Sequence, residues 1–252
     1  MIGAASRRAA HDAANALFEF LLPRMCAACE SPMSAADAGL VCGHCWSRLP
    51  LLPKPQCERC GHPKTGTGCV LCASLPPFVR AVRSLCWVPE RTASRMLAAL
   101  KYEGWSGVGA DLGRRLARLA FPADVRRERA ALVPVPLHPT RQRERGYNQS
   151  AEIARGVSAH WNIPVAPALL TRRVATETQT RLTPGERSAN VKHAFALRPN
   201  AHVNLRGQHL VLVDDVLTTG ATLNECASVL FEAGARTISY LTFGRARSGT
   251  TA

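Results

Sequence analysis

Residues 209–222 read His-Leu-Val-Leu-Val-Asp-Asp-Val-Leu-Thr-Thr-Gly-Ala-Thr, and this segment is the clearest indication of the fold. Residues 210–213 form an unbroken apolar run, which is typical of a strand covered on both faces in a parallel sheet. The run stops at Asp214 and Asp215, which we expect to be partly solvated at the end of the strand. A small, hydroxyl-rich segment follows, and residues 223–231 then space their apolar side chains as an amphipathic helix does. The order predicts strand, loop and helix.

The loop between this strand and helix has the composition of a phosphate site. Backbone N–H groups at a helix N-terminus bind phosphate, and three threonine hydroxyls add donors. Two adjacent carboxylates accept hydrogen bonds from the vicinal hydroxyls of a sugar, or hold water around a magnesium ion. The stretch therefore predicts a ribose 5-phosphate site. It is not a Walker loop, because it lacks the Gly-Lys-Ser/Thr ending.

The alternative is a structural role, in which a buried strand ends in an Asp-Asp turn and a threonine caps the next helix. The full order of apolar run, Asp-Asp, Thr-Thr-Gly and a further Thr is more restrictive than this role requires. The stretch resembles the phosphoribosyl pyrophosphate (PRPP) signature of type I phosphoribosyltransferases. By that resemblance the two carboxylates face the ribose hydroxyls, and residues 218–222 hold the 5-phosphate. The PRPP-binding residues it implies are Val213, Asp214, Asp215, Thr218, Thr219, Gly220, Ala221 and Thr222.

The chain is strongly basic. Its 252 residues leave room for one domain of ordinary size and a smaller one, and its apolar fraction of 46% is that of a folded protein. The formal net charge is +14, and two zinc ions bound by eight thiolates would lower it to about +10. Such a charge fits either a dispersed, solvated surface or a surface for nucleic acid or polyphosphate.

We expect a cytoplasmic protein with no membrane span. No run approaches the roughly 18 apolar residues of a spanning helix. Residues 13–22 are too short and too polar for a secretory signal, and no small-residue cleavage site follows them. Residues 1–25 instead predict a short amphipathic docking helix, with an organelle transit peptide as the alternative suggested by Arg7 and Arg8.

Four Cys-x-x-Cys pairs lie within residues 26–72. The two-residue spacing lets both sulfurs of a knuckle bind one tetrahedral metal ion, and two knuckles complete a closed four-thiolate site. One pair alone could be a redox dithiol, but four in series favour structural zinc. His44 and His62 could replace a cysteine, although exposed bystanders are the simpler interpretation. Sequential pairing predicts two Zn2+ sites, one bound by Cys26, Cys29, Cys42 and Cys45, the other by Cys57, Cys60, Cys69 and Cys72.

The rest of the chain alternates strands and helices. We predict strands at residues 78–88, 131–135, 165–170, 195–197 and 237–243, and helices at residues 92–100 and 111–119 and around residues 154–157. Each set of four cysteines forms one small zinc ribbon, and three prolines within residues 50–55 predict a stiff linker between the two ribbons. Cys86 and Cys226 read as small buried apolar residues. We expect the zinc module at residues 1–75, a second domain at residues 76–245 and a tail at residues 246–252, with Arg245 onward frayed.

Two further segments supply candidate pyrophosphate ligands. Residues 137–150 follow a strand that Pro136 ends, and they are dense in arginine, which suits diphosphate oxygens at the carboxyl end of a sheet. An exposed basic loop is the alternative. Residues 171–190 are polar and suit a lid, a binding loop or a disordered segment. The candidates are Arg141, Arg145, Gln179 and Arg187.

Over nearly its full length the chain resembles the ComF family, which is named for competence and is related to the amidophosphoribosyltransferases. The resemblance is carried by the cysteine knuckles, Leu-Lys-Tyr-Glu-Gly at 100–104, Val-Pro-Val-Pro at 133–136, Arg-Gly-Tyr-Asn-Gln at 145–149, Gln179 with Arg187 and Asn190, and the stretch at 213–220. It implies a type I phosphoribosyltransferase-like α/β fold, a parallel sheet flanked by helices, with a small N-terminal zinc-ribbon module. It also implies a role in uptake or handling of DNA.

As an enzyme, such a protein would displace pyrophosphate from C1 of the ribose with a nitrogen nucleophile. Asp214 and Asp215 would hold the sugar, while Mg2+ and arginine neutralise the leaving group. No stretch can be assigned to a hood that reads a nucleobase, and the zinc module is the candidate for that place. The alternative is a non-catalytic protein that senses PRPP or binds single-stranded DNA. Expected partners are PRPP, single-stranded DNA, and a competence helicase or other competence proteins.

Overall fold

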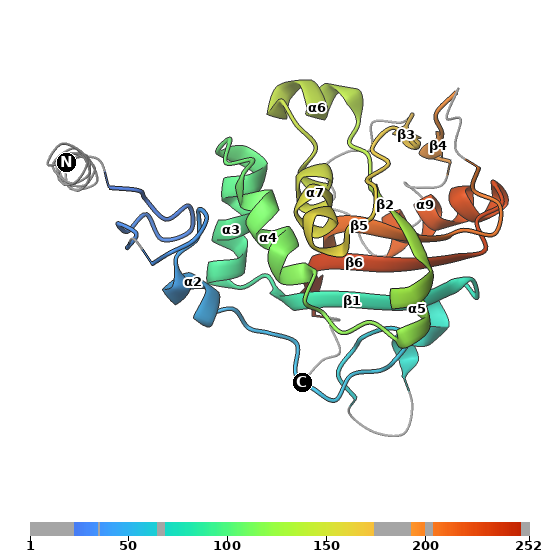
Figure 1. Ribbon diagram of the computed structural model, residues 1–252, viewed down its shortest axis with the longest axis horizontal. Helices are drawn as coiled ribbons and strands as arrows, with labels where there is room; N and C mark the ends of the chain where they lie inside the picture. Colours follow the sequence, from blue (N-terminus) through green and yellow to red (C-terminus); the bar gives the residue numbers. More distant parts are fainter. Residues whose placement is uncertain (1–22, 35, 65–68, 174–192, 200–203, 248–252) are drawn as a thin grey trace, which may run out of the picture.

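The computed structural model describes residues 23–34, 36–64, 69–173, 193–199 and 204–247 (Figure 1). The amphipathic helix predicted within residues 1–25 falls almost wholly outside these ranges. So do Gln179, Arg187 and Asn190 of the polar segment, and the tail beyond residue 247. In the described part of the chain, no helix is long and apolar enough to cross a membrane.

Within the described residues, four parallel strands form the central sheet (Figure 1). They are β1 (Val79–Val88), β2 (Arg129–Pro134), β5 (His209–Leu217) and β6 (Thr237–Ala246), in the order β1-β6-β5-β2. Strand β5 lies inside the sheet, and its apolar side chains are buried on both faces. Leu210 and Leu212 join one core, and Val211 and Val213 join the other. The covered strand and parallel sheet predicted from the sequence are confirmed.

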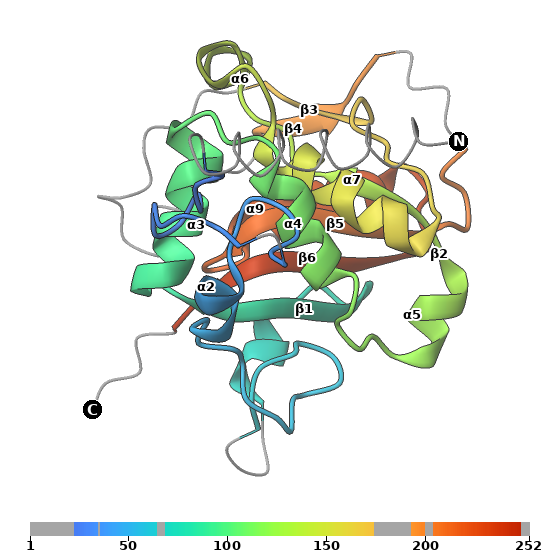
Figure 2. The same ribbon diagram turned by 60° about the vertical axis from the view of Figure 1, so that its left-hand side comes forward.

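Helices cover both faces of this sheet (Figures 1 and 2). One face packs against α3 (Arg91–Tyr102), α4 (Val108–Leu116) and α7 (Gln149–Trp161), and the other packs against α9 (Ala221–Glu232). Helices α4 and α7 approach closely, because a Cβ atom at Gly113 would overlap the backbone oxygen of Ile153. A Cβ atom at Gly156 would likewise overlap Ala110. Glycine is therefore needed at both positions.

The shorter elements complete the described chain. They are α2 (Gly43–Ser47), the 3-10 turn η1 (Val70–Ser74), α5 (Ala123–Glu128), α6 (Pro139–Arg145), β3 (Leu170–Arg172) and β4 (Phe195–Leu197). Strands β3 and β4 pair antiparallel in a separate two-stranded sheet. The predicted strand at 195–197 is thus confirmed.

Some predicted boundaries were wrong. The strand predicted at residues 165–170 is reduced to one bridge between Val165 and Leu132, because the chain turns at Leu169, whose N–H donates to the carbonyl of Ala166. The helix predicted at residues 111–119 begins and ends three residues earlier, since residues 117–119 continue in tighter turns. The arginine-rich segment after residue 137 contains α6, where a loop was predicted.

The predicted linker between the ribbons has a structural role in the sheet. Leu52 N–H donates to the carbonyl of Leu85, and Trp87 N–H donates to the carbonyl of Pro50. Leu51 bridges Cys86 in the same antiparallel run. The linker therefore covers the outer edge of β1, which would otherwise expose unpaired backbone groups.

Arg245 was wrongly placed in a frayed tail. Strand β6 continues to Ala246, and Arg245 is 3% exposed. Its guanidinium donates to the carbonyl of Cys60 at 2.6 Å and to the hydroxyl of Ser84 at 3.4 Å. A buried arginine is tolerated because these acceptors satisfy it, and it ties the end of the sheet to the second cysteine cluster.

Candidate functional site

The acidic pair lies inside strand β5, before its last residues. The strand was expected to end at Asp214, yet it runs on to Leu217, with Asp214 in register with Thr242 of β6. Asp214 is 9% exposed and Asp215 is 6% exposed, so the expectation of partly solvated carboxylates was wrong. Pairing with β6 extends the ladder past the point where the apolar run stops, and this is what buries the pair.

Asp214 is held by neutral donors. Its Oδ1 accepts hydrogen bonds from the hydroxyl of Ser150 at 2.9 Å and from the backbone N–H of Asp215 at 2.9 Å. Burial, followed by the negative charge of Asp215, raises the pKa of Asp214 to about 7. This carboxyl therefore changes its protonation state close to neutral pH.

Asp215 forms an ion pair with the ammonium of Lys101, which projects from the C-terminal end of α3. The Lys101 side chain is 22% exposed. Burial alone would lower the pKa of Lys101, but the neighbouring charges of Asp215 and Asp214 outweigh it and the pKa is raised. The sequence placed Lys101 in a family motif without indicating a role for it, because a lysine at a helix end has an ordinary explanation in the helix dipole.

Residues 145–150 close a ring of contacts around the acidic pair. Arg145 donates to the side-chain oxygen of Gln149, and its guanidinium carbon lies 5.6 Å from the ring centroid of Tyr102. The hydroxyl of Tyr147 donates to the carbonyl of Leu100. Since Ser150 binds Asp214, this segment links α3, the start of α7 and strand β5. Of the four predicted pyrophosphate ligands, Arg145 thus contacts the segment that holds Asp214.

Arg172 adds positive charge near Asp214, and Arg141 is close enough to Arg172 to repel it. Burial lowers the pKa of the Arg172 guanidinium, the charge of Asp214 opposes this, and the charge of Arg141 adds to it. Arg172 also lies over the ring of Phe195, at 5.4 Å from its centroid. The sequence assigned Arg172 to a flexible polar segment, but it belongs to β3, so its proximity to Asp214 was missed.

The threonine loop begins two residues after the acidic pair, at the end of β5. Thr218 and Thr219 are exposed, and Gly220 adopts a left-handed conformation with φ of 84° before α9 begins at Ala221. The hydroxyl of Thr219 accepts the N–H of Ala221 at 3.4 Å. The N-terminus of a 12-residue helix and exposed hydroxyls therefore meet at the carboxyl end of β5.

The first turn of α9 also contacts the end of the zinc module. The Asn224 amide donates to the carbonyl of Ser74 at 3.0 Å, and the Asn224 side-chain oxygen accepts the hydroxyl of Tyr240 at 3.0 Å. Ser74 ends η1, two residues after Cys72. The second cysteine cluster is therefore joined through a short segment to the helix that follows the threonine loop.

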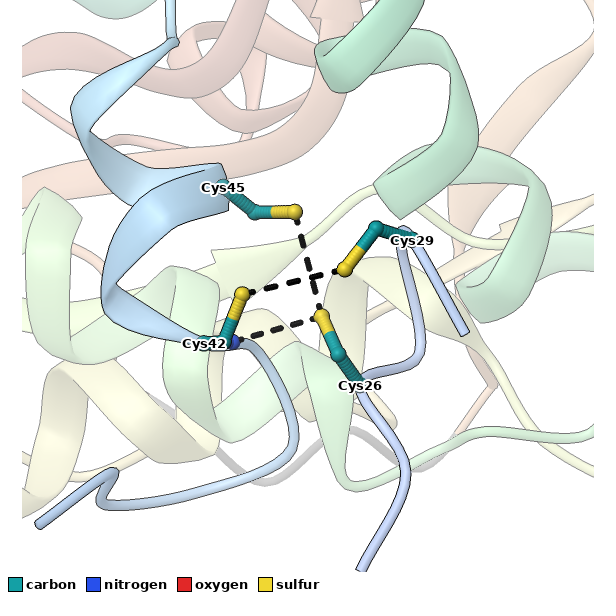
Figure 3. A group of neighbouring side chains, drawn as sticks. All are labelled: Cys26, Cys29, Cys42 and Cys45. Carbon is teal, nitrogen blue, oxygen red and sulfur yellow. Dashed lines mark hydrogen bonds between the residues drawn. The ribbon is translucent and has the colours of Figure 1, made fainter. Parts of the chain in front are cut away.

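Among the described residues, two groups of four cysteines bring all their sulfur atoms within 4.8 Å of one another. The first group is shown in Figure 3, where the Sγ atoms of Cys26 and Cys45 are 3.8 Å apart, as are those of Cys29 and Cys42. In the second group the closest sulfur pairs are 3.5 Å and 3.1 Å apart. A tetrahedral zinc ion with Zn–S bonds of about 2.3 Å places its sulfurs about 3.8 Å apart, which is the spacing of the first group. The second group is tighter, but it offers the same set of four thiolate donors, which suits Zn2+. The predicted sequential pairing is confirmed.

Both cysteine clusters are anchored to helices and strands that follow them in the chain. The N–H of Leu40, in the first ribbon, donates to Asp111 of α4 at 2.6 Å. In the second ribbon, the carbonyl of Arg59 accepts the N–H of Val82 at 2.7 Å. The Arg59 guanidinium donates to four backbone oxygens, those of Cys72, Leu75, Pro76 and Val79. These contacts hold both ribbons against the rest of the protein. Each closed four-sulfur shell also leaves no open position for a substrate, and both observations support a structural role for the zinc sites.

Comparison with known proteins gives the same two parts. Residues 17–75 match a double zinc ribbon domain, and residues 141–251 match a phosphoribosyl transferase domain. The chain is 32% identical to the DNA utilization protein YhgH of Escherichia coli (strain K12) over 225 residues, which cover 86% of this chain and 95% of the relative. It is 28% identical to Competence protein F of Haemophilus influenzae, over 88% of this chain and 90% of that protein.

Among solved structures, the chain is similar to glutamine phosphoribosylpyrophosphate amidotransferase from B. subtilis, with 20% identity and a TM-score of 0.35. That alignment covers 53% of this chain and 26% of the other. The family is shown by the curated relatives, which match almost from end to end. The chain belongs to the ComF family, and it joins a double zinc ribbon to a phosphoribosyltransferase domain.

Proposed function

We propose that the protein binds PRPP together with Mg2+ at residues 213–222. The observation that supports this most is the position of two buried carboxylates two residues before a loop with the exposed Thr218 and Thr219, at a helix N-terminus. The match to a phosphoribosyl transferase domain spans this stretch. Asp214 and Asp215 would accept the ribose hydroxyls, and the donors of residues 218–222 would hold the 5-phosphate.

The residues present fit a magnesium ion that arrives with the diphosphate. Mg2+ is usually bound by one or two carboxylates and by substrate phosphates, and Asp214 and Asp215 supply carboxylate oxygens. When bound, the ion would neutralise charge on the diphosphate. Lys101 and Ser150 would orient the two carboxylates from within the protein, since each already contacts one of them.

In a transfer reaction, the bond between C1 and the pyrophosphate oxygen would break and a bond from C1 to a nitrogen nucleophile would form. Arg145 and Arg141 are the described candidates for the leaving pyrophosphate, and Gln179 and Arg187 are the candidates outside the described residues. Their task would be to hold and neutralise the leaving group.

We further propose that this site serves a role in DNA uptake and use, in the cytoplasm. The relatives are named a DNA utilization protein and a competence protein, which supports such a role. The alternative is a non-catalytic protein that senses PRPP or binds single-stranded DNA. The net charge of +14 favours binding of single-stranded DNA, because the anionic phosphate backbone of DNA binds to basic protein surfaces.

A thermal-shift experiment tests PRPP binding. The melting temperature of the zinc-loaded protein should rise with PRPP and Mg2+, because a ligand of the native state stabilises it by mass action. Asp214→Asn should abolish this shift, since the amide replaces a charged acceptor. Asp214 is preferred to a double replacement, because neutralising Asp215 would leave the Lys101 ammonium without its partner.

Glu58→Gln is the matched control. Glu58 lies on the second ribbon, and its exposed carboxylate is paired with Arg80 of β1. The control should keep the full shift. A full shift in Asp214→Asn would show that the acidic pair has a structural role, and a wild-type protein that never responds would refute PRPP binding.

A further inference from the structure

Tyr102 is a highly exposed aromatic side chain, and its ring is contacted by the guanidinium of Arg145. It ends α3 and is 76% exposed, more than any other large hydrophobic side chain among the described residues. Its hydroxyl makes no hydrogen bond within the part of the chain that the structure describes. A single exposed aromatic side chain is ordinary on a protein surface, so a binding role for Tyr102 has to be argued from its neighbours.

Two series of contacts lead from Tyr102 to the acidic pair. The residue before it, Lys101, contacts Asp215, and Arg145 lies over the ring itself. Arg145 then contacts Gln149, whose neighbour Ser150 binds Asp214. These contacts, together with the chain itself, connect Asp215 to Asp214 through Tyr102, which is the most exposed residue of the series.

A basic helix adjoins the ring. Helix α6 carries Arg141, Arg143 and Arg145, and it buries none of its residues. Figures 1 and 2 show α6 projecting at the same edge of the molecule as the C-terminal end of α3. An exposed aromatic ring flanked by arginines is the arrangement that stacks a nucleobase and holds its phosphate, because every base has a π-face and the backbone is anionic.

We infer that Tyr102 is the stacking platform for a nucleobase whose phosphate is held by the arginines of α6. The ligand is a base joined to phosphate, either a free nucleotide or one unit of a single strand. This inference deepens the proposed function, because it places a base beside the sugar-phosphate site. The alternative is a structural role, in which Tyr102 only covers the Arg145 guanidinium through a cation–π contact and does not bind bases.

Fluorescence anisotropy with two labelled oligomers separates these interpretations. One is a thymidine oligomer of about 12 nucleotides, and the other has abasic sites in place of every base, so that both carry the same phosphates. The full-length, zinc-loaded protein is compared with Tyr102→Ala and Tyr102→Phe. The exposure of Tyr102 predicts unchanged melting temperatures for both variants, which checks their folding.

The wild-type protein should bind the base-bearing oligomer more tightly than the abasic one. Tyr102→Ala should weaken binding of the base-bearing oligomer about tenfold and leave the abasic oligomer unaffected, whereas Tyr102→Phe should retain wild-type binding. Equal losses on both oligomers, or no loss on either, would overturn the inference. So would a wild-type protein that does not distinguish them.

Thymidine monophosphate added as a competitor identifies the source of the base. Competition that disappears in Tyr102→Ala assigns a free nucleotide, and a Tyr102-dependent oligomer signal without competition assigns a strand. The PRPP-induced shift is measured separately in the wild-type protein. If the PRPP-induced shift is absent but base binding depends on Tyr102, the proposed function is refuted and this inference stands. If the shift is present but the protein does not distinguish the two oligomers, this inference is refuted and the proposed function stands.

Discussion

The ammonium of Lys101 forms an ion pair with the carboxylate of Asp215, and this contact joins the end of α3 to the centre of the sheet. Asp215 is nearly buried, so the cation beside it offsets a charge that burial would otherwise disfavour. The same helix contacts the first ribbon, because Arg95 pairs with Glu30 and donates to the carbonyl of Ala28. Helix α3 thus connects the acidic pair to a zinc cluster.

Lys101→Met should lower the free energy of unfolding by about 1–3 kcal/mol, because Asp215 would be left buried without its counter-cation. Urea denaturation measures this loss. Combining Lys101→Met with Asp215→Asn should recover part of it, since neither charge then remains, and a double-mutant cycle gives the coupling. A cycle with no coupling would show that the pair does not matter to folding.

The raised pKa of Asp214 predicts a pH dependence with a definite sign. Its pKa is about 7 in the folded protein and about 3.9 when unfolded, so the native state holds the extra proton between these values. Asp214 therefore makes its full contribution to the free energy of unfolding below its unfolded-state pKa, and this contribution is lost as the pH rises toward 7. Asp214→Asn should remove this dependence. Wild-type and variant stability curves that run parallel between about pH 5.5 and 7 would contradict the assignment.

Two zinc ions per chain are expected from elemental analysis of the fully reduced protein. Cys86→Ala should keep both, because Cys86 lies outside the clusters, whereas Cys29→Ser and Cys72→Ser should each lose one. Cys72→Ser should also weaken the PRPP response more than Cys29→Ser does, because Ser74 contacts Asn224 beside the threonine loop. One zinc or none in the wild-type protein would contradict the two-ribbon assignment.

Binding of single-stranded DNA should weaken as salt rises, because released counterions drive it. Replacing Arg141 and Arg143 with alanine should reduce the slope of log K against log salt by about 0.7 for each of the two arginines that binds a phosphate. Arg126 and Arg127 are the matched control, since both are exposed on α5, away from α6 (Figure 1). An affinity that does not change with salt would count against DNA binding at α6. So would an equal change in the salt slope when either pair of arginines is replaced.

The parts of the fold that the sequence predicted are those encoded by local patterns. The unbroken apolar run at residues 210–213 indicates a strand covered on both faces, and the structure buries it that way. The two-residue cysteine spacing likewise fixes each knuckle, so the sequential pairing could be predicted.

The parts that were missed depend on contacts between distant elements. Nothing near Asp215 in the sequence indicates that Lys101 neutralises it. Arg245 follows an apolar strand and precedes a polar end, so it reads as a tail residue, and its burial depends on acceptors from distant parts of the chain, the carbonyl of Cys60 and the hydroxyl of Ser84. The burial of the acidic pair itself follows from pairing with β6, which local composition does not reveal.

Calorimetric titration of the zinc-loaded protein with PRPP in the presence of Mg2+ is the decisive experiment for the sugar-phosphate site. We predict saturable binding at one site per chain, which Asp214→Asn abolishes and Glu58→Gln retains. Leaving out Mg2+ should weaken this binding, since the ion offsets diphosphate charge. Binding that survives unchanged in Asp214→Asn, or a wild-type protein that shows no saturable binding of PRPP, would contradict the assignment of residues 213–222 as a sugar-phosphate site.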